Sequence, residues 1–136
     1  INRRVFRVFA RLPVNFIICH DDIVTSHGPT LSPAWMRCYI FPRYREFWGL
    51  VKAAGKEVIF MSDGCMNAYA DDVMANGAQG IISEPYTDYR VIARKHKDCF
   101  LAGEGDCRIL LNNNPIEIKS MVKQMVETAK KIRKKT

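Results

Sequence analysis

The sequence has no long apolar run and no paired-cysteine motif. No hydrophobic segment approaches the ~20 residues that a membrane-spanning helix needs, and no signal-peptide core stands near the start. The five cysteines are odd in number and none has C-x-x-C spacing, which argues against a disulfide framework. We therefore expect a cytoplasmic protein whose cysteines are mostly small buried thiols.

The short motifs that bind phosphate or build hydrolase sites are also missing. The sequence contains no G-x-G-x-x-G, no G-x-x-x-x-G-K-[ST] and no G-x-S-x-G. A nucleotide phosphate loop and a hydrolase nucleophile elbow are therefore not indicated. The pair Asp21-Asp22 loosely resembles the metal-binding acids of response-regulator receivers, but no lysine follows the fourth apolar segment, where such a site needs one.

The chain is basic, but its excess charge is not arranged for binding nucleic acid. The net charge is +7, from 21 basic and 14 acidic residues, and much of the excess lies in residues 130–135. No aromatic residue interrupts this run, and cations at a helix end complement the helix dipole. We interpret the run as a solvated helix end and expect neither a nucleic-acid nor a membrane partner.

Four short apolar segments alternate with helical patterns. They span residues 14–19, 58–61, 80–83 and 99–102. Short apolar runs separated by helices are typical of parallel strands that are buried on both faces, so we expect an α/β fold of about four parallel strands with flanking helices. Two architectures fit: an open doubly wound sheet, or half of a (β/α)₈ barrel, whose whole length is about 250 residues.

The helical patterns carry start and stop signals. Ser32, followed by a proline, predicts an N-cap, and Pro42 either breaks that helix or starts a second one. Gly55 is expected just past the end of the second helix. Thr87 is the candidate N-cap of a later helix, and Asn114 begins the last helix, while an arginine-rich amphipathic helix precedes the first strand.

Polar residues, mostly acidic, follow every predicted strand. Because the carboxyl ends of parallel strands meet at one edge of a sheet, we expect these side chains to share one rim. Acids also cap helix N-termini, so each of them has a purely structural alternative. The set is His20, Asp21, Asp22, Ser62, Asp63, Glu84, Glu104 and Asp106.

Crowded carboxylates need a cation, a basic substrate or protonation to coexist, so metal binding, proton transfer and recognition of N–H donors all remain open. His20 and His27 flank the loop after the first strand. Each is either a general acid or base or, more simply, a hydrogen-bonded loop histidine. The candidate catalytic residues are Asp21, Asp22, Asp63 and Glu84.

The order and spacing of several short motifs resemble the uroporphyrinogen decarboxylase family, and more closely its branch of cobamide-dependent methyltransferases. The resemblance covers about residues 14–129. The motifs that carry it are Asp21-Asp22-Ile23, Gly28, Leu31-Ser32-Pro33, Pro42-Arg43-Tyr44, Gly55-Lys56, Ser62-Asp63-Gly64, the stretch from Leu101 to Asp106, Leu110-Leu111, Asn114-Pro115 and Glu117-Ile118.

The resemblance implies that residues 1–136 are one partial domain, the C-terminal half of a (β/α)₈ barrel with roughly strands five to eight, in a fragment of a longer chain. The complete enzyme would then transfer a methyl group with a corrinoid or a thiol, using a small-molecule or macrocyclic substrate and a corrinoid protein as partner. One alternative is decarboxylation of a porphyrinogen. Another is an inactive half-barrel that associates with itself or with the missing N-terminal half.

The methyltransferase branch binds zinc through a His-x-Cys pair, and this chain departs from that pattern. The matching triplet reads Met61-Ser62-Asp63, so a thioether and a carboxylate replace the imidazole and the thiolate. Asp63, Glu84 and Cys107 remain candidates for a different metal site. Zinc or a corrinoid is therefore expected only in the full-length form.

Overall fold

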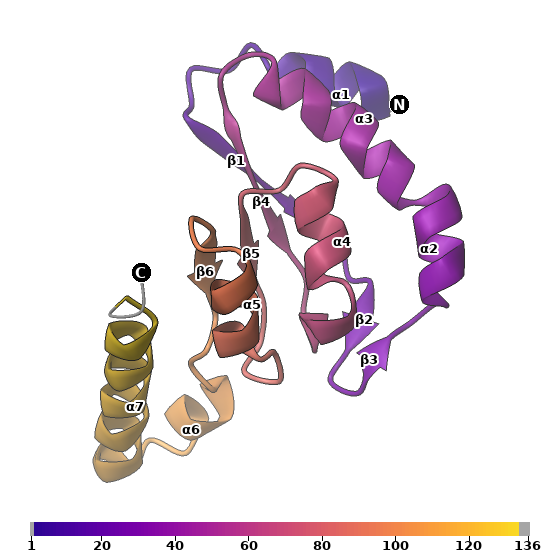
Figure 1. The fold of residues 1–136 in the computed structure, drawn as a ribbon. Helices are drawn as coiled ribbons and strands as arrows, with labels where there is room; N and C mark the ends of the chain where they lie inside the picture. Colours follow the sequence, from indigo (N-terminus) through magenta and orange to yellow (C-terminus); the bar gives the residue numbers. More distant parts are fainter. Residues whose placement is uncertain (1, 134–136) are drawn as a thin grey trace.

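The computed structural model describes residues 2–133, which form a mixed α/β fold (Figure 1). The strands are β1 (Phe16–His20), β2 (Val24–Thr25), β3 (Gly28–Pro29), β4 (Glu57–Met61), β5 (Gly80–Ile82) and β6 (Phe100–Ala102). The helices are α1 (Asn2–Phe9), α2 (Pro33–Tyr39), α3 (Phe41–Lys52), the 3₁₀ turn η1 (Met66–Ala68), α4 (Ala70–Ala75), α5 (Tyr89–Lys95), α6 (Cys107–Leu111) and α7 (Pro115–Arg133).

Four of the strands form one parallel sheet in the order β1-β4-β5-β6. These are the four strands that the apolar segments predicted, and the prediction of about four parallel strands with flanking helices is confirmed. Each strand lies beside the next one in the chain, with no reversal of direction along the sheet. A doubly wound sheet has such a reversal, so this strand order does not favour the doubly wound alternative.

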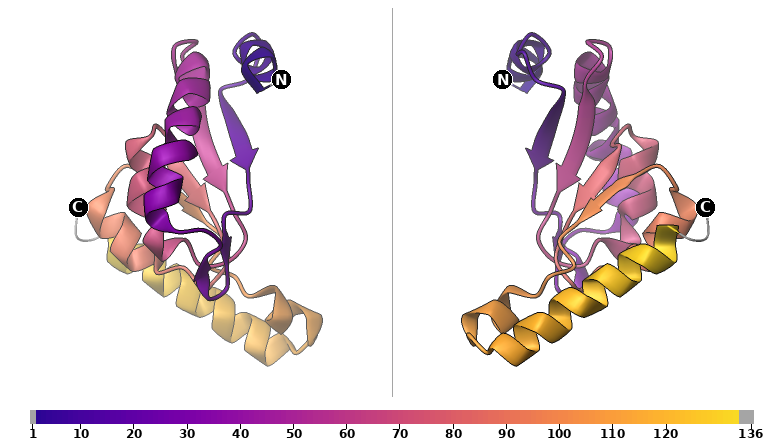
Figure 2. Two further views of the ribbon diagram at one scale, coloured as in Figure 1. Left: turned by 90° about the vertical axis from the view of Figure 1, so that its right-hand side faces the viewer. Right: turned by 90° about the vertical axis from the view of Figure 1, so that its left-hand side faces the viewer.

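The helices that connect the four strands, α2 to α5, lie on one face of the sheet, as right-handed crossovers in a constant direction require (Figure 2). Side chains of this face, such as Ile17, Phe60 and Ile81, join Trp48 of α3 and Val73 of α4 in one hydrophobic cluster. At the two ends of the row, Phe6 of α1 stacks on Phe47 of α3, and Arg90 of α5 donates a hydrogen bond to Thr128 of α7. The core therefore sits between the sheet and its helices.

The opposite face of the sheet is apolar, and none of the helices between residues 2 and 133 lies over it. Successive residues of a strand point to opposite faces, so Phe16 and Ile18 turn away from the core that holds Ile17. Their exposed fractions are 54% and 49%, and Phe100 at the other edge of the sheet is 52% exposed. This surface is called the open face below.

Several of the expected helix boundaries are confirmed. The Ser32 hydroxyl accepts a hydrogen bond from the Trp35 amide at 3.2 Å, and Pro42 stands in the first turn of a separate helix, α3. Gly55 follows α3 with a positive φ of 75°. The prediction for α5 is wrong by one residue, because Asp88 caps the helix and Thr87 is buried.

Two small elements were not predicted: the β2–β3 hairpin and α6. Their lengths of two and five residues are too short for hydrophobic periodicity to reveal. The expectation of mostly buried thiols is only partly met, because Cys38 and Cys107 are exposed and the other three cysteines are half-buried. In the run 130–135, residues 134 and 135 lie outside the described part of the chain.

Within residues 2–133, no helix combines the length and the apolar character needed to cross a membrane.

Candidate functional site

The candidate site is the rim formed by the carboxyl ends of β1, β4 and β5. Parallel pairing places His20 opposite Met61, and the Asp21 amide donates to the Met61 carbonyl at 3.0 Å. The Ser62 amide likewise donates to the Ile82 carbonyl at 3.1 Å. Backbone hydrogen bonds therefore continue past the strands and fix the three rim loops side by side.

Asp22 connects the first two loops. Its Oδ1 accepts a hydrogen bond from the Asp63 amide at 3.0 Å and lies 3.1 Å from His20 Nε2. The Asp63 amide, followed by His20, lowers the pKa of Asp22 from its ordinary value. The Asp22 carboxylate is thus held in its charged form at a solvent-exposed position next to a second carboxylate.

Glu84 connects the second and third loops. Its Oε2 accepts from the Gly64 amide at 2.8 Å. Gly64 has a positive φ of 93°, and a Cβ added there would lie 2.5 Å from the Thr25 carbonyl carbon. Only glycine allows this close approach of the β2–β3 hairpin to the loop after β4.

Buried hydroxyl groups support the rim loops through hydrogen bonds to the loop backbone. The Ser83 hydroxyl lies 2.8 Å from the carbonyls of both Ser62 and Gly64, and the Thr87 hydroxyl accepts from the Met66 amide at 3.0 Å. Ser62, Ser83 and Thr87 are all buried, so these bonds form away from water, where an unmet partner would be costly. Sequence reasoning missed Ser83 and Thr87 as supports of the rim, because their partners lie about twenty residues away in the chain.

Asp21 is turned toward the helical layer. Its Oδ2 accepts a hydrogen bond from the Tyr44 hydroxyl at 2.5 Å. Burial, together with the Asp21 carboxylate, raises the pKa of Tyr44, so the phenol stays protonated and continues to donate. Asp21 is therefore separate from the pair Asp22 and Asp63, although all three are close in the rim.

Three side chains of the rim converge closely enough to hold one metal ion. The ligand atoms of His20, Asp22 and Asp63 all lie within 4.8 Å of one another, and all three residues are exposed. Of the sequence-based metal candidates, Asp63 belongs to this group. Glu84 instead binds the Gly64 amide, and Cys107 is the exposed first residue of α6.

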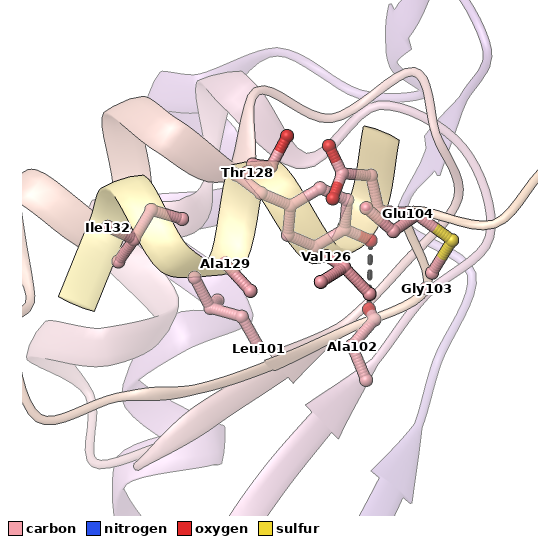
Figure 3. Close-up of a pocket in the computed structure, with 10 residues that line it drawn as sticks. Leu101, Ala102, Gly103, Glu104, Val126, Thr128, Ala129 and Ile132 are labelled. Carbon is pink, nitrogen blue, oxygen red and sulfur yellow. Dashed lines mark hydrogen bonds between the residues drawn. The ribbon is translucent and has the colours of Figure 1, made fainter. Parts of the chain in front are cut away.

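Of the two remaining rim acids, Asp106 caps a helix and Glu104 lines a pocket. Asp106 caps α6 by accepting from the Arg108 amide at 2.9 Å, and its carboxylate pairs with the Arg108 guanidinium. Glu104 lines a mostly apolar pocket of 320 Å³ between β6, α5 and α7 (Figure 3). A second pocket, of 280 Å³, lies at the other end of the sheet beside β1, and Phe6, Trp48 and Asp21 contribute to it. The two pockets thus flank the two edge strands.

Comparison with protein-family models, with curated proteins and with solved structures finds no match to this chain.

Proposed function

We propose that this chain is the C-terminal half of a (β/α)₈-barrel enzyme of the uroporphyrinogen decarboxylase type, whose complete form transfers a methyl group with a corrinoid or a thiol. The strand order, the single helical layer and the apolar open face support the barrel. In a (β/α)₈ barrel, the helices lie outside and the face without helices becomes the packed interior. Four of eight strands, with both edges of the sheet free, are consistent with a half.

The proposal rests chiefly on the convergence of carboxylates at the rim. The Asp63 amide binds Asp22 and the Gly64 amide binds Glu84, so acids from three strand ends are held at the edge where barrel enzymes place their catalytic groups. A preorganised acidic rim can orient a cationic substrate, N–H donors or a metal ion. Asp21 adds a fourth carboxylate near this edge, which Tyr44 holds toward the helical layer.

The zinc pair of the methyltransferase branch does not fit this rim. Met61 stands where the resemblance requires a histidine, and a thioether is a poor zinc ligand. Asp63 replaces the cysteine and offers a carboxylate. No catalytic step is therefore assigned to a metal held at positions 61 and 63.

Kinetics of the full-length enzyme test the assignment of the rim. We expect Asp21→Asn, Asp22→Asn, Asp63→Asn and Glu84→Gln each to lower kcat/KM, and the pH–rate profile to change in at least one variant. Asp98→Asn is a control at an exposed acid that precedes β6 rather than following a strand. Unchanged kinetics in all four rim variants would remove the assignment.

Spectroscopic titration separates the reaction classes. Changes in the visible spectrum of an added corrinoid, without binding of a porphyrin, support methyl transfer. The reverse result supports the alternative, decarboxylation of a porphyrinogen-like macrocycle.

A third possibility, an inactive half-barrel that pairs with itself or with the missing N-terminal half, is favoured by the open face. Sedimentation of the chain alone tests it, because a stable isolated monomer argues against a half-barrel.

A further inference from the structure

We propose that His20, Asp22 and Asp63 form a binding site for one divalent transition-metal ion of the Zn²⁺ or Co²⁺ type. The site differs from the ligand pair that the resemblance places at positions 61 and 63, and it shares only Asp63 with that pair. Its three ligand atoms, one imidazole nitrogen and two carboxylate oxygens, lie within 4.8 Å of one another. Tetrahedral zinc binds such ligands at about 2.0–2.2 Å, so two ligands of one ion stand about 3.4 Å apart. The widest separation in the group would therefore have to shrink by about 1.4 Å, which rotation of exposed side chains can supply.

The backbone already brings the ligands to this spacing. His20 ends β1 and pairs in register with Met61, which ends β4, so both ligand-bearing loops leave the sheet at the same level. The Asp63 amide then binds the Asp22 carboxylate at 3.0 Å, which locks one loop to the other. A metal ion would therefore bind two elements that are already fixed relative to each other.

The site has more carboxylate groups than cationic side chains, so a bound cation would balance its charge. Within residues 2–133, Asp22 has His20 as its sole ion-pair partner and Asp63 has none, although the chain carries an excess of basic residues. A second His–Asp pair, His96 and Asp71, provides the contrast, because the Asp71 carboxylate there also binds the ammonium group of Lys95 at 2.8 Å. In the rim, the group next to the His20–Asp22 pair is not an ammonium group but the carboxylate of Asp63.

The donor set also indicates the kind of metal and its accessibility. Imidazole with carboxylates suits zinc, cobalt and related ions, whereas calcium and magnesium prefer oxygen ligands alone. Three protein ligands leave at least one coordination position for water or a substrate atom, as in catalytic rather than structural zinc sites. The exposure of all three residues gives such a ligand access from solvent.

Titration with Co²⁺, followed by visible absorption and by competition with Zn²⁺, tests the site. We expect one ion per chain, with no thiolate-to-cobalt charge-transfer band, because the ligands are nitrogen and oxygen. His20→Ala and Asp63→Asn should each weaken binding at least tenfold, since loss of an outer partner of a metal ligand alone costs 10- to 100-fold. The matched control is His96→Ala, which removes the imidazole of the other His–Asp pair and should leave the affinity unchanged.

Circular dichroism of each variant, together with the milder substitution His20→Gln, separates loss of a ligand from loss of the fold. Failure of the wild-type chain to bind cobalt or zinc would overturn the proposal. So would a thiolate charge-transfer band, which would place the ion at a cysteine such as Cys38 or Cys107, or an equal loss of affinity in His96→Ala. The measurement needs no corrinoid and no turnover, so its outcome is independent of the proposed methyl transfer.

Discussion

Tyr44 and Asp21 are joined by a hydrogen bond of 2.5 Å between the phenol hydroxyl and the carboxylate. Tyr44 belongs to α3, and its ring stacks on Trp48 with a centroid separation of 4.7 Å. Asp21 is the first residue after β1. The bond therefore attaches a residue of the rim to the layer of helices that packs under the sheet.

Tyr44→Phe should destabilise the fold by about 1–2 kcal/mol, because it removes a hydrogen bond to a carboxylate and leaves the stacked ring in place. Urea unfolding measures the effect. Tyr39→Phe is the control, since Tyr39 is exposed and its hydroxyl makes no hydrogen bond within the described residues. Equal unfolding midpoints for Tyr44→Phe and the wild type would mean that the bond contributes nothing to stability.

Gly64→Ala should cost more than Gly55→Ala, although both glycines have a positive φ. At Gly55 the added methyl group meets open space, so the cost is that of the left-handed backbone, about 1–2 kcal/mol. At Gly64 the methyl group would collide with the backbone of Thr25, which adds about 1–3 kcal/mol of overpacking. Thermal unfolding of the two variants provides the comparison. Similar losses would indicate that the β2–β3 hairpin moves aside freely.

The cysteines should differ sharply in their reaction with iodoacetamide. Cys38 and Cys107 are exposed and should be modified first. Burial raises the pKa of the Cys19 thiol to about 11, so little thiolate is present near pH 8 and its modification should be slow. Mass spectrometry of peptides over a time course measures the order. Modification of Cys19 as fast as that of Cys38 would show that the pocket beside β1 opens readily.

The Asp71 carboxylate should contribute a small stability that depends on pH. Lys95 and then His96 lower its pKa below the ordinary value of 3.8. For a depressed carboxyl pKa, the contribution is present above the unfolded value and is lost as the pH falls through the folded value. All three groups lie near the surface, so we expect no more than about 0.5 kcal/mol. Urea midpoints of the wild type and Asp71→Asn should differ at neutral pH and converge below pH 3.8. A difference that persists in acid would mean that the substitution acts through packing.

The strands and the rim could be predicted from the sequence because both follow from local pattern. A segment such as residues 80–83 is apolar and bounded by turns, and the acid after it needs no tertiary information to be placed at a strand end. The neighbours within the rim could not be predicted in the same way. Asp22 binds the Asp63 amide across 41 residues, and this contact depends on the register of β1 against β4.

His20 shows the same limit. In the sequence it is a histidine at the end of an apolar run, and a hydrogen-bonded loop histidine is the simpler interpretation. The structure places its Nε2 next to Asp22 and within reach of Asp63, which turns three separate polar residues into one cluster. Cys107 is the opposite case. The sequence makes it a candidate metal ligand together with Asp63, but the structure places it at the start of α6, a helix too short to predict from periodicity.

The two faces of β1 provide the last prediction, which uses adjacent residues of the same type. Ile17 faces the core and is 9% exposed, so Ile17→Ala should cost about 2–5 kcal/mol. Ile18 lies on the open face and is 49% exposed, so Ile18→Ala in the isolated chain should cost about 1 kcal/mol or less. Denaturant titration at low protein concentration measures both.

If a second sheet covers the open face, the cost of Ile18→Ala should rise with protein concentration, whereas the cost of Ile17→Ala should stay constant. Equal costs for the two variants at every concentration would contradict the assignment of the open face, because the alternation of a strand would then no longer separate the core from solvent.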